Sequence, residues 1–115
     1  MEEIFTIAEQ EMIDLKHPYV GTEHFLLAFL KIYGSEYINY KELKEYIIKV
    51  VGSSYKTSEY ILYTPILRSI KNECENIYDA MIRVITDDNS IAYNILLSMG
   101  IDIEAFYLSI INSLY

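Results

Sequence analysis

The chain has 115 residues, enough for one domain with a hydrophobic core. Hydrophobic residues make up 52% of it and charged residues 23%, whereas only 4 glycines and 2 prolines are present, which excludes linker-rich and disordered chains. A net charge of -8 repels nucleic-acid phosphates and no local basic patch offsets it, so we expect no nucleic-acid partner. The single cysteine, Cys74, cannot form an internal disulfide, which favours a reducing, cytoplasmic location.

No segment is expected to enter a membrane or to direct export. The longest uninterrupted apolar run, Phe25 to Leu30, is far shorter than the ~20 residues of a membrane-spanning helix. The first residues, Met1 to Glu3, lack the basic and apolar segments of a signal peptide. We therefore expect no membrane partner.

Apolar residues at helical spacing predict three helices in the first half of the chain. The first is expected over residues 3–16. Thr22 is a good N-cap for the second, over residues 23–33, which is apolar on all sides and therefore expected to be a buried central helix. After an irregular piece at residues 35–40, a strongly amphipathic helix is expected over residues 41–51.

The second half is expected to follow a linker over residues 53–63. Thr64 and Pro65 form a start signal, because Thr caps helices and Pro suits the first helical position. Four helices are then expected, over residues 65–75, 77–86, 90–99 and 103–114. The fold class is all-α. We predict two pseudo-repeated four-helix units packed into one small domain, repeat one over about 1–52 and repeat two over about 64–115, with Phe25 to Leu30 and Ile77 to Ile85 in the central helices.

Residues 17–30 read H-P-Y-V-G-T-E-H-F-L-L-A-F-L. This run resembles the signature of the N-terminal (Clp repeat) domain of the ClpA, ClpB and ClpC unfoldases, roughly H-x-x-[IV]-G-T-E-H-[IL]-L-L-A-L-[IL]. Residues 63–65 are similar to the Y-T-P that opens the second repeat of that family, and residues 88–102 to the end of the repeat. The resemblance covers nearly the whole chain and implies an all-α domain that binds proteins.

The chain also departs from this family. It is shorter than the usual double repeat, and residues 76–79, N-I-Y-D, stand where the second repeat is expected to have G-T-E-H. No G-x-x-x-x-G-K-[ST] loop is present to hold the phosphates of a nucleotide. We therefore expect a degenerate, freestanding N-domain without an ATPase.

Glu23 is the best candidate for a functional residue. The resemblance implies that Glu23, with Thr22 beside it, lies at a recognition site for phosphorylated arginine, a degradation mark. A carboxylate pairs with a guanidinium, and amides at a helix start can take a phosphate. The alternative is that Thr22 and Glu23 only cap a helix, which the negative net charge favours because it repels phosphate ligands.

No other group of residues predicts catalysis, a metal or a cofactor. His17, His24 and Cys74 lack paired ligand spacing, so we expect His24 to be a half-buried structural residue and Cys74 a small core residue. Residues 87–90 lack the spacing of a calcium loop and are expected to form a helix-capping turn. The acidic residues near the N-terminus are expected to form a solvated face: Glu2, Glu3, Glu9, Glu11 and Asp14.

Two functional hypotheses remain, and neither is enzymatic. The first is a protein-interaction module of the Clp N-domain type, which binds adaptors or marked substrates or modulates a Clp unfoldase. The second is a homodimer with a structural role, because tyrosine is favoured at interfaces. Its partner surface would be rich in tyrosine and consist of Tyr37, Tyr40, Tyr55, Tyr60 and Tyr63.

Overall fold

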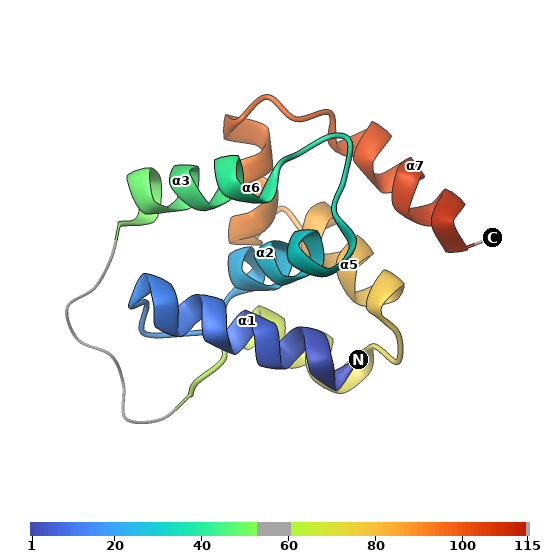
Figure 1. Cartoon of the computed structure of the whole chain (residues 1–115). Coiled ribbons are helices and arrows are strands. Elements are labelled where there is room, and N and C mark those ends of the chain that lie inside the picture. Colours follow the sequence, from blue (N-terminus) through green and yellow to red (C-terminus); the bar gives the residue numbers. More distant parts are fainter. Residues whose placement is uncertain (53–60, 115) are drawn as a thin grey trace.

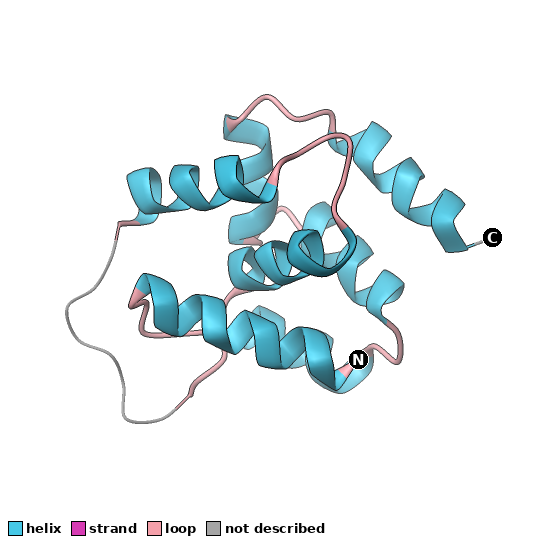
Figure 2. Ribbon diagram, in the orientation of Figure 1, coloured by secondary structure: helices cyan, strands magenta, loops and turns pink. Residues whose placement is uncertain are grey.

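Helices joined by loops make up the described part of the molecule (Figure 2). The computed structural model describes residues 1–52 and 61–114, apart from the side chains of residues 113 and 114. No strand occurs in these residues, although one isolated parallel bridge joins Val20 to Tyr63. The helices are α1 (Glu2–Leu15), α2 (Thr22–Tyr33), α3 (Tyr40–Val51), α4 (Pro65–Glu73), α5 (Ile77–Thr86), α6 (Ile91–Ser98) and α7 (Ile103–Leu114).

The predicted helix positions are confirmed to within one or two residues at each end. Side chains at the helix starts account for this agreement. The hydroxyl of Thr64 accepts a hydrogen bond from the amide of Leu67 at 3.4 Å, with Pro65 at the first helical position. Asp102, directly before α7, accepts from the amide of Ala105 at 3.0 Å. Such signals are local, so the sequence alone reveals them.

The start of α2 corrects one expectation. Its N-cap is Gly21, and Thr22 is instead the first helical residue. The Thr22 side chain is buried and pairs with Ser90 Oγ at 2.9 Å, while its oxygen accepts from the amide of Ala92 at 3.1 Å. A buried hydroxyl needs hydrogen-bond partners, and Thr22 finds them at the start of α6. These bonds connect the start of α2 to the start of α6.

Helix α2 lies in the middle of the molecule, with α1 and α3 on two sides of it (Figure 1). It contacts α1, α3, α5 and α6, and every residue from Gly21 to Leu30 is buried. The expectation of a buried central helix is confirmed. The radius of gyration, 13.2 Å, equals the ~13 Å of a compact chain of this length. The described helices include none with the length and apolar character needed to cross a bilayer.

The two halves of the chain differ in their helices. Helix α5, expected to be the second central helix, buries one side and contacts α2, α4, α6 and α7. The second half contains four helices, whereas the described residues of the first half contain three, because residues 34–39 form a loop. A pseudo-twofold relation between the halves stays a prediction.

Glu11 contradicts the expected solvated acidic face, because only 2% of it is exposed. Its carboxylate accepts a hydrogen bond from the hydroxyl of Tyr40 and pairs with Lys44 Nζ at 3.0 Å and Lys31 Nζ at 3.6 Å. Burial raises the pKa of Tyr40, and the bond to Glu11 raises it further. Burial opposes the charge of Lys44, but hydrogen bonds to Asp14, Glu11 and Tyr40 more than offset it and raise the pKa of Lys44. This ionic cluster connects α1, α2 and α3.

Candidate functional site

A pocket of about 300 Å³ lies at the start of α2, on residues of the sequence motif. Its walls come from the turn between α1 and α2, the first residues of α2, the end of α3, the residue before α4 and the first residue of α6. Segments far apart in the sequence therefore meet at this point. The lining residues are His17, Pro18, Tyr19, Glu23, His24, Val51, Thr64 and Ile91.

Glu23 lines this pocket although only 3% of it is exposed. Its side chain folds back over Gly21, so that a Cβ atom at position 21 would collide with Glu23 Oε1. The backbone at Gly21 is extended, with φ at -114°, so glycine matters there for the space that it leaves to the Glu23 side chain rather than for its conformation. The glycine of the motif thus makes room for the carboxylate of the motif.

The two histidines of the motif form a continuous hydrogen-bonded chain. The amide of Gly21 donates to His24 Nδ1 at 2.8 Å, which assigns the His24 proton to Nε2. His24 Nε2 then donates to His17 Nδ1 at 2.8 Å, and His17 Nε2 donates to the carbonyl of Gly52 at 2.7 Å. Both rings are buried in this arrangement. The chain of bonds ties the start of α2 to the end of α3 and keeps the pocket walls in place.

Glu23 Oε1 also lies 3.1 Å from His24 Nδ1. The expected half-buried position of His24 is wrong, because the ring packs fully inside, with 1% of the residue exposed. Its structural role is nevertheless evident from its partners.

The pocket is suited to a cationic group on an apolar stem. Glu23 supplies a negative charge, and Pro18, Val51 and Ile91 supply apolar walls. Tyr19 and Thr64 line the same space, whereas no lysine or arginine of the described chain does so. A guanidinium would find a carboxylate here, but an anion would find only neutral donors.

The start of α5 lacks such a site. Asn76 caps this helix and accepts from the amides of Tyr78 at 3.1 Å and Asp79 at 2.9 Å. Asn76 and Asp79 are exposed and hydrogen-bond to each other at 3.0 Å. Residues 76–79, which stand where a second G-T-E-H is expected, therefore make an ordinary solvated helix start.

The tyrosines of the expected partner surface have separate neighbours. Tyr37 is exposed and packs near the ring of Phe106, whereas Tyr40 belongs to the ionic cluster around Glu11. Tyr63 is half-buried beside the ring of Phe5, and its pKa is raised by burial first and then by the charge of Glu9. The remaining two, Tyr55 and Tyr60, lie outside the described residues.

The residues considered for a metal site form no ligand cluster in the described part of the chain. Within residues 1–52 and 61–114, no three histidine, cysteine or acidic side chains come together as metal ligands. Cys74 is half-buried at the end of α4, where Arg83 Nη1 lies 3.8 Å from its sulfur and 2.6 Å from Glu73 Oε2. Asp87 accepts from the amide of Asn89 at 2.9 Å, which confirms a capping turn there.

The sequence motif contains Glu23 but not all of the residues that complete its pocket. Val51, Thr64 and Ile91 line it from three other parts of the chain, and no local signal in the sequence marks them as pocket residues. The spacing of His17 and His24 across the turn was the one available signal for the histidine chain. No family model and no curated protein matches the chain.

Proposed function

We propose that the chain is a non-catalytic protein-interaction module of the Clp N-domain type, which takes up marked substrate segments or adaptors at the pocket of Glu23. The observation that carries the proposal is the position of Glu23, a buried carboxylate that faces an open pocket. A buried carboxylate is costly unless it is paired, and a guanidinium ligand would pair it. The bound segment would present arginine, in the modified form that the resemblance implies.

The pocket supports weak rather than tight recognition of phosphoarginine. The guanidinium end would pair with Glu23, and the apolar walls would cover the stem. The phosphoryl group would meet neutral hydroxyls of Tyr19 and Thr64 within a chain of net charge -8. We expect dissociation constants in the high micromolar to millimolar range, which corresponds to roughly 4–6 kcal/mol.

Titration of the ¹⁵N-labelled chain with phosphoarginine, followed by NMR, tests this proposal. The expected result is a set of saturable shifts on residues 20–26 with Val51 and Ile91, the residues that surround the pocket. Glu23→Gln should abolish them because it removes the charge. Glu45→Gln makes the same change of charge on an exposed position of α3 and should leave them intact.

A second variant guards against a folding defect in Glu23→Gln. Ile91 is 42% exposed at the pocket wall, so Ile91→Lys should fold normally and place a competing ammonium beside Glu23. It should reduce binding at least about tenfold. The proposal is wrong if neither variant changes the titration, or if the wild-type chain shows no shifts at millimolar phosphoarginine.

A further inference from the structure

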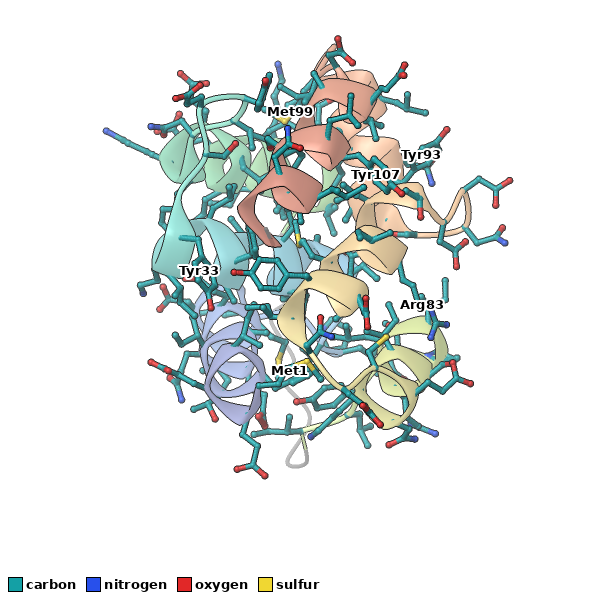
Figure 3. All side chains as sticks on the ribbon, turned by 90° about the vertical axis from the view of Figure 1, so that its right-hand side faces the viewer. Met1, Tyr33, Arg83, Tyr93, Met99 and Tyr107 are labelled. Atoms are coloured by element: carbon teal, nitrogen blue, oxygen red, sulfur yellow. The ribbon has the colours of Figure 1, made fainter. Side chains whose placement is uncertain are left out.

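A second hollow, of about 500 Å³, opens at the other end of α2, between the loop of residues 34–39, α5 and α7. Figure 3 looks onto this side of the molecule, with Tyr33 on the last turn of α2 and α7 crossing in front. Tyr33 lies ten positions after Glu23 in α2, or about 15 Å along the helix. Five aromatic side chains line this aromatic hollow: Phe29, Tyr33, Tyr37, Tyr78 and Phe106.

The aromatic rings form a floor and a rim. Phe29 and Phe106 are buried, whereas Tyr33 and Tyr37 are exposed. The rings of Phe29 and Tyr33 lie 5.1 Å apart between centroids, and those of Tyr37 and Phe106 lie 6.4 Å apart. Both separations fall in the range of favourable aromatic pairs, so each rim tyrosine is held against a buried ring.

The electrostatics of the aromatic hollow select a positive ligand. Glu36 is the carboxylate that lines it, and no lysine, arginine or histidine of residues 1–52 and 61–114 does so. The faces of aromatic rings attract cations, and the net charge of -8 adds to that attraction. The negative charge would repel an anionic ligand, and a neutral apolar ligand would gain no electrostatic attraction to Glu36.

The size and the polar rim favour a side chain on a polypeptide over a small free cation. About 500 Å³ is the volume of pockets that hold drug-sized ligands, so a small ammonium ion would fill only a fraction of it. Ser35, Ser109 and Asn112 line the same hollow, and their hydroxyl and amide groups can bind peptide N–H and C=O groups. We propose that the aromatic hollow binds a lysine or arginine side chain of a partner polypeptide. The aromatic hollow shares no lining residue with the pocket of Glu23, so this proposal does not depend on the function proposed for that pocket.

NMR titrations with three capped amino acids test this inference. Nα-acetyl-lysine amide and Nα-acetyl-arginine amide, whose side chains keep their positive charge, should bind in the millimolar range. They should shift residues 33–37 and 106–110. Uncharged acetyl-norleucine amide should bind at least about threefold more weakly, since it lacks the attraction between cation and ring. Tetramethylammonium, the small-cation probe, should also bind more weakly than either peptide-like cation. Glu23→Gln should leave the shifts of residues 33–37 and 106–110 unchanged, because Glu23 does not line this hollow.

Paired variants at exposed positions assign the effect to the aromatic hollow. Glu36→Gln should weaken lysine and arginine binding about threefold, and Glu45→Gln, its control on α3, should have no effect. Tyr37→Leu should weaken binding at the hollow at least about threefold, and Tyr19→Leu, at another exposed tyrosine outside the hollow, should not. Equal binding of norleucine amide or tetramethylammonium, or unchanged binding in both Glu36→Gln and Tyr37→Leu, would overturn the inference.

Discussion

Replacing Glu11 by alanine should destabilise the fold by about 2–3 kcal/mol. The Tyr40 hydroxyl would lose a charged acceptor, a bond worth about 1.5–3 kcal/mol. Lys44 would lose its ion pair to Glu11 at 3.0 Å but keep the one to Asp14, also 3.0 Å, and it is 23% exposed, which limits the loss. Lys31 is 56% exposed, so its pair adds less than about 1 kcal/mol.

Urea denaturation followed by circular dichroism measures this loss. Asp14→Ala is the matched control, because Asp14 contacts the same Lys44 Nζ but is 71% exposed, and it should cost under about 1 kcal/mol. In a Lys44→Met background the cost of Glu11→Ala should fall by about 1 kcal/mol, since the two residues are coupled. A cost for Glu11→Ala below about 0.5 kcal/mol would show that Glu11 is solvated, and the reasoning would fail.

Leu26→Ala, in the fully buried part of α2, should cost about 2–5 kcal/mol in the same assay, and a loss under about 1 kcal/mol would show that this helix is peripheral. Gly21→Ala should displace the Glu23 carboxylate and weaken phosphoarginine binding at least about tenfold by NMR, whereas unchanged binding would show that the carboxylate does not need this space. The pKa values of Tyr40 and Tyr63 are raised in the folded chain, so folding favours the protonated form of both hydroxyls. Their contribution to stability is complete below pH ~10, the ordinary tyrosine value, and is lost as the pH rises through the folded-state pKa values. Urea midpoints should therefore decline above pH ~10, and less steeply in Tyr63→Phe; identical declines in both proteins would contradict this.

The positions of the helices could be predicted because their determinants are local. Thr64 with Pro65 starts α4, and Asp102 starts α7, through contacts within four residues. The left-handed backbone at Gly34, with φ at 71°, ends α2 in the same way. Each of these signals can be read without knowing what packs against the helix.

Burial of polar side chains could not be predicted in the same way. Glu11 lies in an acidic stretch, and only the packing of α3 against α1 gives it Tyr40 and Lys44 as partners. Threonine is a common N-cap residue, but the hydroxyl of Thr22 hydrogen-bonds instead to Ser90 and Ala92, about seventy residues later in the chain. Tertiary structure determines these partners, and the local sequence pattern carries no information about them.

The candidate site shows the same division. The motif pointed to Glu23 as a candidate, and the space that Gly21 leaves for its carboxylate is seen only in the structure. The walls of its pocket and the aromatic hollow depend on elements distant in sequence, such as Ile91 and Phe106. The sequence thus indicated where one site begins, whereas the fold supplied what surrounds it.

The central claim is that Glu23 recognises marked protein segments. The most direct measurement compares the affinity of the chain for one fluorescently labelled, unstructured polypeptide with and without phosphorylated arginines, by fluorescence anisotropy. The account predicts at least about tenfold tighter binding of the phosphorylated form, or about 1.4 kcal/mol, and loss of this preference in Glu23→Gln. Equal affinity for the two forms, or a preference that persists in Glu23→Gln, would contradict it.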